Sequence, residues 1–373
     1  MFYDEEDNED NNVIIDIGSD SCKVGLSRDL DPKVIPTCIG TTNAKNYFEF
    51  GLKNAQFVGK NAIKKRRTSR LFFPVEQGII SNFDGIERIF DNIFKEELKI
   101  SPEEYNMILT EPCFNPKENR EKIAHILFDT YSVPALYIGN QAVLSLNSTG
   151  RSTGISIESG EGITQIAPIY DNFYLPHAAK KIDFTGKALT ELMLSLLNEG
   201  NLQFTEKDKL LIKSIKEEVC YVAENYDNEK PYIKPYSYTL PDGTIIVIKE
   251  QRIKCPELIF SPTKLNQGKE GIAEVCNNVI QKCDDDIRRD LYSNIILSGG
   301  NTKFKGFKKR FSLEFKELVP IYRIFEVSDV EDKIKAVWEG AKLISKFIQK
   351  ESSWVTKQEY EENGERIIHS KFF

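Results

Sequence analysis

Ile14-Ile15-Asp16-Ile17-Gly18-Ser19 is the stretch that decides the fold, and a related one follows at Ile155-Ser156-Ile157-Glu158-Ser159-Gly160-Glu161-Gly162. Each reads as an apolar strand, an acidic residue, a glycine turn that contains serine, and a second strand. The second strands are expected over 22–27 and 164–170. The shared order predicts two halves of similar plan.

The glycine turns indicate a site for a polyphosphate. Glycine lets the backbone approach a ligand closely, and successive backbone N–H groups form a concave anion site. One turn from each half, Gly18-Ser19 and Gly160-Glu161-Gly162, could therefore hold a phosphate chain from two sides. A third turn, Ser298-Gly299-Gly300-Asn301-Thr302, lies between a strand and a helix, where a nucleotide can contact the helix end. The alternative for each turn is an ordinary hairpin without a ligand.

Acidic residues beside these turns would repel phosphate unless a cation lies between them. The acids concerned are Asp16, Glu158 and Glu161. Mg²⁺ keeps several waters and bridges to carboxylates through them. Lys23, on the strand after the first turn, could neutralise phosphate as a point charge, although it could also be a surface lysine.

Composition bounds the other possibilities. The 373 residues favour two packed bodies, and the net charge of −7 argues against general nucleic-acid binding, which needs a basic face. The seven cysteines contain no CxxC pair and predict reduced thiols in the cytosol or nucleus, and the three histidines are too dispersed for a metal cluster. We expect no signal peptide and no membrane span, because the chain starts with an acidic segment and has no apolar run of about 18 residues.

Periodicity and turn residues predict alternating strands and helices after the initial hairpin, which is an α/β fold. In the first half we expect a loop-rich patch at 41–70, strands at 105–110 and 135–138, and helices at 83–99, 117–131 and 141–146. Ser81 or Asn82 is expected to cap the first of these helices. In the second half we expect strands at 152–158 and 294–297, a hairpin at 237–248, and helices at 186–198, 207–224, 271–283, 306–317 and 332–350.

Several collinear stretches are specific to one family. They are Gly139-Asn140-Gln141-Ala142-Val143-Leu144-Ser145-Leu146, Gly150-Arg151-Ser152-Thr153-Gly154, Leu175-Pro176-His177, Cys220-Tyr221-Val222-Ala223, Leu240-Pro241-Asp242-Gly243, Lys282-Cys283-Asp284, Asp286-Ile287-Arg288-Arg289-Asp290-Leu291-Tyr292, Leu297-Ser298-Gly299-Gly300 and Trp354-Val355-Thr356-Lys357-Gln358-Glu359-Tyr360. On these residues the chain resembles actin from about residue 13 to residue 373.

The resemblance implies two similar actin-like (ribonuclease-H-like) domains flanking a nucleotide cleft, each with a smaller inserted subdomain. The implied boundaries are 1–37, 74–148 and 336–373 for subdomain 1, 38–73 for subdomain 2, 149–184 and 268–335 for subdomain 3, and 185–267 for subdomain 4.

By similarity to actin, the implied cofactors are ATP or ADP and Mg²⁺ or Ca²⁺. Asp16 would order waters on the cation, Glu158 stands where actin has an aspartate beneath the cation, and Gln141 would help to orient the attacking water. The alternative for Gln141 is a helix N-terminal amide with only a local bond. The implied nucleotide contacts are Gly18, Ser19, Lys23, Gly160, Glu161 (to the ribose), Gly162, Gly186, Lys216, Glu217, Gly299, Gly300, Thr302 and Phe304.

This sequence departs from actin at positions that affect the chemistry. Asp20 replaces a glycine, Glu158 and Glu161 replace aspartates, and Ile334 lies where actin has a lysine near adenine. Gln165 replaces the histidine beside the hydrolytic water. Because glutamine can orient water but does not titrate near pH 7, we expect a weak ATPase, slower than actin.

The surfaces that actin uses for assembly also differ. The loop at 43–52 holds three aromatic residues, which suit interface anchors but could equally pack back onto the small subdomain. The plug segment at 264–267 includes Lys264, whose burial without a partner would be costly. Glu339 and Asn172 alter the groove that receives amphipathic helices, so actin-binding proteins should bind it poorly.

Two charged segments have alternative explanations. The acidic segment at 4–10 is by similarity a contact for a motor protein, although we favour a solvated disordered segment. The basic run at 64–67 is either a nuclear signal or, as we favour, a solvated basic face.

Three functions compete. The first is a Mg-ATP-binding protein of cytoskeletal assembly in the cytoplasm, with other actin-like subunits as partners. The second is a non-polymerising actin-related subunit of a larger complex, such as a chromatin remodeller or a dynactin-like assembly, which would permit a nuclear location. The third, a small-molecule kinase of the same fold, is disfavoured by the full-length resemblance. No direct contact with nucleic acid or membrane is expected.

Overall fold

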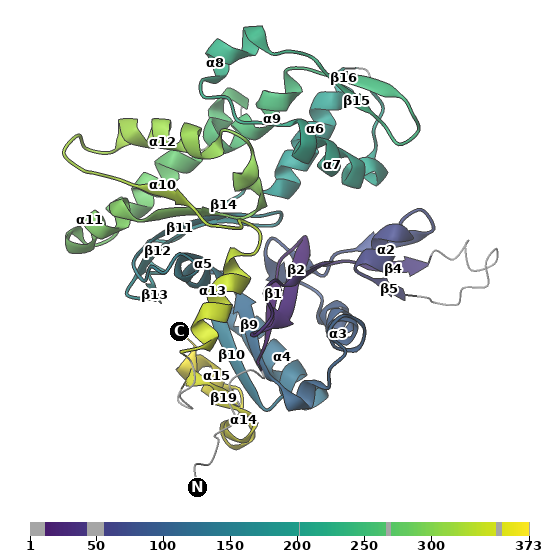
Figure 1. Ribbon diagram of the computed structural model, residues 1–373, viewed down its shortest axis with the longest axis vertical. Helices are drawn as coiled ribbons and strands as arrows, with labels where there is room; N and C mark the ends of the chain where they lie inside the picture. Colours follow the sequence, from purple (N-terminus) through teal and green to yellow (C-terminus); the bar gives the residue numbers. More distant parts are fainter. Residues whose placement is uncertain (1–11, 43–55, 201, 266–269, 348–352, 373) are drawn as a thin grey trace. The chain divides into compact units, whose positions relative to one another are not determined.

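The computed structural model describes residues 12–42, 56–200, 202–265, 270–347 and 353–372 (Figure 1). The chain divides into two compact units, unit 1 (Met1–Arg151 and Lys335–Phe373) and unit 2 (Ser152–Ile334). Each unit contains a mixed β-sheet with helices packed on it. The predicted α/β fold with two similar halves is therefore confirmed, whereas the finer division into four subdomains stays a prediction.

The sheet of unit 1 has the strand order β19-β10-β9-β1-β2-β3. The central strands β1 (Asn12–Ile17), β9 (Asn106–Glu111) and β10 (Ala135–Asn140) run parallel. The outer strands β2 (Ser21–Leu26), β3 (Lys33–Pro36) and β19 (Val355–Thr356) pair antiparallel with their neighbours. Parallel strands of this kind are buried on both faces, and every residue of β1 is buried.

Side chains alternate between the two faces of this sheet because successive residues of a strand point in opposite directions. Val13 and Ile15 pack with α3 (Phe83–Asn92) and α4 (Lys117–His125) on one face. Ile14 packs on the other face with α5 (Gln141–Asn147) and α13 (Ala336–Ser345). Asp16 shares the parity of Ile14, so the strand directs its side chain to the α5 face.

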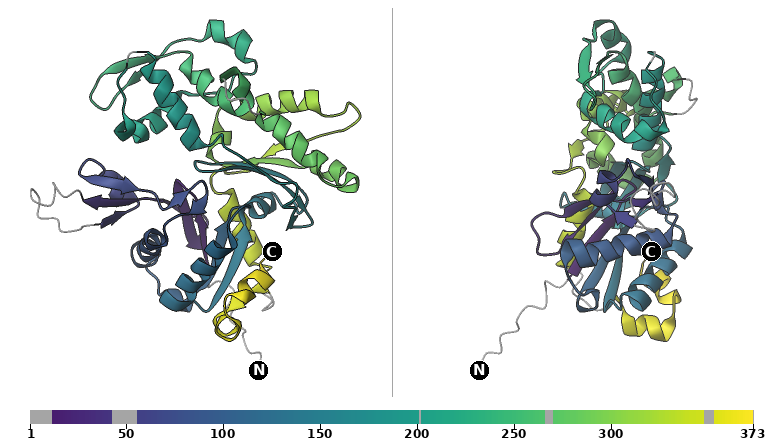
Figure 2. Two further views of the ribbon diagram at one scale, coloured as in Figure 1. Left: turned by 180° about the vertical axis from the view of Figure 1, so that it is seen from behind. Right: turned by 90° about the vertical axis from the view of Figure 1, so that its right-hand side faces the viewer.

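The sheet of unit 2 has the order β13-β12-β11-β17-β18, and β14 (Lys180–Ile182) also pairs with β12. Its strands are β11 (Gly154–Ser159), β12 (Thr164–Tyr170), β13 (Phe173–Tyr174), β17 (Ile295–Ser298) and β18 (Val327–Asp329). Helices α10 (Ile272–Gln281), α11 (Asp285–Ser293) and α12 (Phe307–Leu318) pack against these strands (Figures 1 and 2). A second group contains α6 (Gly186–Asn198), α7 (Lys209–Val219), α9 (Gln251–Phe260) and the hairpin of β15 (Tyr236–Thr239) and β16 (Ile245–Ile248).

The two sheets repeat one plan. In each, a hairpin (β1–β2 or β11–β12) is followed by a strand that pairs in parallel with the first strand of the hairpin, and then by a further parallel strand. The hairpin registers match as well, because Asp16 lies opposite Lys23 and Glu158 lies opposite Gln165. The repeat predicted from the two acidic strand ends is confirmed.

The prediction of a loop-rich patch at 41–70 was wrong for the residues that the structure describes. β4 (Ile39–Thr42), β5 (Gln56–Val58) and β6 (Ser69–Phe72) form a three-stranded sheet, and α2 (Lys60–Lys64) packs on it. The strands are short and polar, so their pattern is weak, and the sheet is instead held by long-range pairing and by the burial of Ala62.

Two helices are shorter than predicted because other hydrogen bonds compete for their ends, long-range in the first case and local in the second. The helix expected at 207–224 is α7, which stops at Val219. Tyr221 and Val222 then donate their N–H groups to the carbonyl oxygens of Arg252 (3.1 Å) and Lys305 (2.9 Å). The helix expected at 332–350 is α13, which begins only at Ala336, because the Asp332 side chain accepts a hydrogen bond from the Ile334 N–H and forms a turn.

Other helices agree with the expected ranges or were missed. Asn82 caps α3 by accepting from the Gly85 N–H at 2.6 Å, and the helix continues as a π-turn over Ile93–Leu98. The sequence pattern missed α9, which has Pro256 inside it, and α11, which is mostly charged. Among the described residues, no helix combines the length and the apolar composition needed to cross a membrane.

Gly340 permits the close contact between α13 and α5 in unit 1. A Cβ at this position would lie 1.7 Å from the Leu144 carbonyl oxygen. We expect Gly340→Ala to lower the free energy of unfolding by about 3 kcal/mol, because two helix backbones must separate. Urea unfolding measures this change.

Gly300→Ala is the matched control for that experiment. No atom lies within 4 Å of a Cβ built there, so stability without ligand should change by less than about 0.5 kcal/mol. Equal stability of the two variants would contradict the packing argument.

Candidate functional site

A buried carboxylate lies at the end of β1 in unit 1. Asp16 is 3% exposed, and its Oδ1 accepts hydrogen bonds from Thr110 Oγ1 (2.6 Å) and Gln141 Nε2 (3.1 Å). These residues meet because the parallel strands β1 and β9 end at the same sheet edge, where α5 begins with Gln141. Asp16 and Gln141, which the resemblance gave separate roles, are thus brought together, and Thr110 joins them.

Lys23 faces the same carboxylate from the neighbouring strand. Its Nζ lies 3.4 Å from Asp16 Oδ2, and both side chains are largely buried. Antiparallel register places the two residues directly opposite each other. Next to Lys23, burial raises the pKa of the Cys22 thiol to about 11, and this thiol lies 3.2 Å from Thr37 Oγ1. Cys22 therefore stays an uncharged part of the core.

The first glycine turn connects β1 to β2. The Gly18 N–H donates to the Ser21 carbonyl oxygen at 3.2 Å, and Ser19 Oγ accepts from the Gly78 N–H at 3.1 Å. The N–H of Ser19 makes no hydrogen bond within the described part of the chain, so it can donate to an anion. Asp20 is exposed at the tip of the turn.

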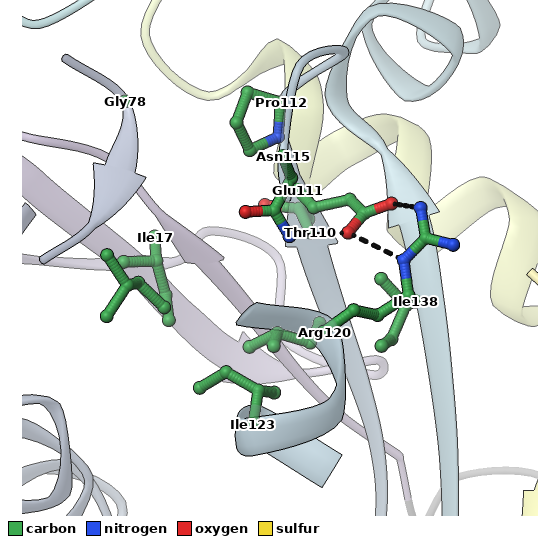
Figure 3. Close-up of a pocket in the computed structure, with 11 residues that line it drawn as sticks. Ile17, Gly78, Thr110, Glu111, Pro112, Asn115, Arg120, Ile123 and Ile138 are labelled. Atoms are coloured by element: carbon green, nitrogen blue, oxygen red, sulfur yellow. Dashed lines mark hydrogen bonds and ion pairs between the residues drawn. The ribbon is translucent and has the colours of Figure 1, made fainter. Parts of the chain in front are cut away.

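A small cavity lies below this turn in unit 1 (Figure 3). Its volume is about 20 Å³, enough for one water, and Ile17, Gly78 and Thr110 are among its lining residues. Figure 3 shows the Glu111 and Arg120 side chains paired at its edge, where Arg120 Nε donates to Glu111 Oε2 at 3.0 Å. This buried pair holds the start of α4 against the end of β9.

The second hairpin, in unit 2, repeats the first with different chemistry. Glu158 occupies the position equivalent to Asp16, and it accepts a hydrogen bond from Gln165 Nε2 at 2.8 Å. Gln165 is fully buried and replaces the cation of the first hairpin by an amide. The turn closes in the same way, because the Gly160 N–H donates to the Ile163 carbonyl oxygen at 2.8 Å.

The start of α6 packs directly on this turn. The Gly186 N–H donates to the Gly160 carbonyl oxygen at 2.9 Å, and a Cβ on Gly186 would lie 2.3 Å from Glu161 Oε2. Lys216 is 2% exposed, and its Nζ donates to the Gly186 carbonyl oxygen (2.9 Å) and to Thr190 Oγ1 (3.0 Å). Lys216 therefore fixes the start of α6 and lies 4.0 Å from Glu161 Oε2.

The third glycine turn is hydrogen-bonded to the second one. Asn301 Nδ2 donates to Ser159 Oγ at 3.1 Å and to the Gly160 carbonyl oxygen at 2.9 Å. Gly299 has φ of +86°, and a Cβ there would lie 2.4 Å from the Ser159 carbonyl oxygen. Glycine alone permits this approach, so the turn at 160–162 is held from two sides before any ligand binds.

Comparison with known protein families identifies the family of this chain. The family described as Actin matches residues 7–210 and 201–373. The chain belongs to the actin family. Members of this family generally bind ATP or ADP together with a divalent cation, so the chain is an actin-like nucleotide-binding protein.

Three further expected nucleotide contacts of this actin-family chain are Glu217, Thr302 and Phe304. Glu217 is exposed on α7 and lies 3.9 Å from Lys213 Nζ. Phe304 packs in the hydrophobic core of unit 2, and Thr302 Oγ1 donates to the Gly299 carbonyl oxygen at 2.8 Å. The turn around Gly299 and Gly300 is close to Gly160 through Asn301. Their roles as ligand contacts stay predictions.

The acidic side chains of this actin-family protein fit a hydrated cation. Within the described residues, no three His, Cys, Asp or Glu side chains gather into a metal cage. Each hairpin supplies a single carboxylate, Asp16 in unit 1 and Glu158 in unit 2. A Mg²⁺ ion held at either one would take most of its ligands from water and phosphate, as this ion prefers.

The predicted assembly surfaces fall partly outside the described residues, as do the segments at 4–10, 43–52 and 266–267. Lys264 is one of the described residues of unit 2, and its Nζ forms an ion pair with Asp227 Oδ2 at 2.6 Å. Asn172 is exposed with φ of +65° in the β12–β13 turn, and Glu339 is half-buried on α13 in unit 1. How these three residues affect binding partners stays a prediction.

Sequence reasoning missed Thr110 and recognised Asn301 only as part of a turn. Thr110 had a usable signal, because it ends a buried parallel strand beside β1. The role of Asn301 depends on a partner 142 positions away, for which the sequence carries no local signal.

We expect Asn301→Ala to lower the free energy of unfolding by about 1–3 kcal/mol, because Ser159 Oγ and the Gly160 carbonyl lose a donor in a buried place. Hydrogen exchange should accelerate at 159–163 and 184–187. Lys303→Ala, at an exposed neighbouring position, is the control and should leave both measurements unchanged. Unchanged exchange in Asn301→Ala would show that the asparagine does not hold the turn.

Proposed function

We propose that this actin-family protein binds Mg-ATP through the turns that follow β1 and β11 and uses the nucleotide to control cytoskeletal assembly with other actin-like subunits. The matching registers of the two hairpins, with an acid before each glycine turn, carry the proposal. Family membership supports the contribution of both turns to one nucleotide site. A cytoplasmic location accords with this role.

The residues around the first turn would act on the phosphates and on water. Mg²⁺, when bound, would neutralise phosphate charge, and Asp16 and Glu158 would hold its water ligands. Lys23 already faces Asp16 and offers a second cation to the phosphates. Gln141 Nε2 is bonded to Asp16 and Thr110, so its Oε1 remains to accept from an attacking water.

We expect Lys23→Gln to weaken ATP binding at least about tenfold, since one phosphate-facing charge is lost. Isothermal calorimetry with ATP, in the presence of Mg²⁺ and then of EDTA, measures the ATP affinity. Lys99→Gln, on the surface of unit 1, is the control and should bind as the unchanged protein does. An unchanged protein that gives no heat with adenine nucleotides would contradict the proposed function.

Glu217→Gln tests a second expected contact. Glu217 is exposed, so its loss should change stability by less than about 0.5 kcal/mol. If it contacts the nucleotide, as the resemblance implies, ATP affinity falls in the same calorimetric assay. Unchanged affinity would remove Glu217 from the site and leave the other contacts in place.

Hydrolysis is proposed to be slow. The side chain of Gln165 is fully buried, its Nε2 is bonded to Glu158, and an amide has no proton that titrates near pH 7. We expect single-turnover phosphate release slower than that of muscle actin, and faster in Gln165→His, which restores a titrating group. Gln165→Leu is the control without a polar group. A rate in the unchanged protein equal to that of muscle actin would refute this part.

The second candidate is a non-polymerising subunit of a larger complex, such as a chromatin remodeller or a dynactin-like assembly. The charge of Lys264, paired with Asp227, favours it, because a charged plug segment is costly to bury in a filament. Sedimentation with Mg-ATP separates the candidates, since only the first predicts a pellet of the protein alone. A pull-down from native extract then identifies the partners.

A further inference from the structure

Six cations lie within eleven residues of unit 1, on α2, on the turn that follows it and on β6. This basic patch comprises Lys60, Lys64, Lys65, Arg66, Arg67 and Arg70, all of them exposed. Within the described residues none of the six forms an ion pair with an acid, and the sequence from Gln56 to Phe72 contains no acidic residue. As far as the described residues show, no acid neutralises the patch, on a chain whose net charge is −7.

Local hydrogen bonds fix the backbone that carries these cations. α2 ends at Lys64, and a turn follows in which the Lys65 carbonyl oxygen accepts from Thr68 N–H (3.0 Å), Ser69 N–H (3.0 Å) and Ser69 Oγ (2.7 Å). The Lys65 ammonium lies 3.8 Å from the centre of the Phe57 ring. A folded turn of this kind presents its charges to a docking partner rather than as an extended linear signal.

The chain itself holds a segment of matching charge. Residues 4–10 contain six acids, Asp4, Glu5, Glu6, Asp7, Glu9 and Asp10, and they lie outside the described residues. This segment joins the structure at Asn12, the first residue of β1. The two oppositely charged groups are equal in number, so each can neutralise the other.

The strand directions separate the two groups within one copy. β3 runs in the same direction as β1, and Pro36 lies opposite Ser21 at the end where β1 finishes. The basic patch follows β3 at that end, whereas residues 4–10 enter at the other, about 20 Å away along β1. At about 3.5 Å per residue, only the outermost acids of the segment could reach back, so one copy cannot neutralise its own patch fully.

We propose that residues 4–10 of one copy dock on the basic patch of a second copy. The contact joins two different surfaces of unit 1. It therefore forms either a reciprocal two-fold dimer or, where it runs head-to-tail, a ring or an open chain of copies. This inference concerns the assembly named under the proposed function and rests on it. It identifies charge, and not an apolar plug, as the source of attraction between copies.

Sedimentation velocity at several protein concentrations tests the proposal. Lys64→Glu, Arg67→Glu and Arg70→Glu, combined in one variant, should reduce the self-association constant at least about tenfold at 0.05 M salt. Self-association of the unchanged protein should itself fall as salt rises from about 0.05 M to about 0.3 M. Circular dichroism confirms that the variant is folded.

The matched control combines Lys282→Glu, Lys305→Glu and Lys316→Glu in unit 2, where all three lysines are exposed. Each variant exchanges three cations for three anions, so both carry the same net charge. Self-association should persist in the control. Equal loss in both variants would show a general effect of net charge and overturn the proposal.

A charge exchange gives the decisive result. A variant with Asp4→Lys, Glu6→Lys and Glu9→Lys should also lose self-association, and mixing it with the patch variant should restore association between the two. Failure of the mixture to associate, or a concentration-independent contact within one copy, would overturn the proposal. Unaltered self-association in the patch variant would also overturn the proposal. Nucleotide binding, measured by calorimetry, tests the proposed function separately and does not depend on this result.

Discussion

A carboxylate buried in a protein must be hydrogen-bonded or paired with a cation, and Asp16 imposes this requirement on unit 1. Its two oxygens are satisfied by Thr110 and Gln141 on one side and by Lys23 on the other. These partners belong to β9, α5 and β2, so elements that are distant in sequence must keep their places around one side chain. The need to satisfy Asp16 therefore also fixes the end of β1, where the glycine turn begins.

Unit 2 has a half-buried carboxylate, Glu158, at the equivalent position, with glutamine in place of lysine opposite it. Glu158 accepts from Gln165, and the turn at Gly160 is held by Asn301 and by the start of α6. The two halves thus share backbone geometry while their polar partners differ. Because backbone register depends on strand pairing and not on the side chains of the turn, the chemistry of each hairpin can diverge without loss of the fold.

Charged groups in the interior and at the surface differ in whether they have a partner of opposite charge. Several interior charged groups are paired, as in the contacts of Lys216 and of Arg310 with Glu257. The cations around α2, in contrast, have no acidic partner among the described residues. Their charge is available for contact with another molecule.

The sequence alone determined the two hairpins, the α/β class, a helix cap at Ser81 or Asn82 and the acids before each glycine turn, because strand alternation, turn residues and helix caps act over a few neighbouring positions. Only the tertiary structure decided that α7 stops at Val219, that Lys216 points inward to Gly186, and that Asn301 locks the Gly160 turn. Each of these depends on a hydrogen-bond partner at least 30 residues away, and local periodicity carries no information about such a partner.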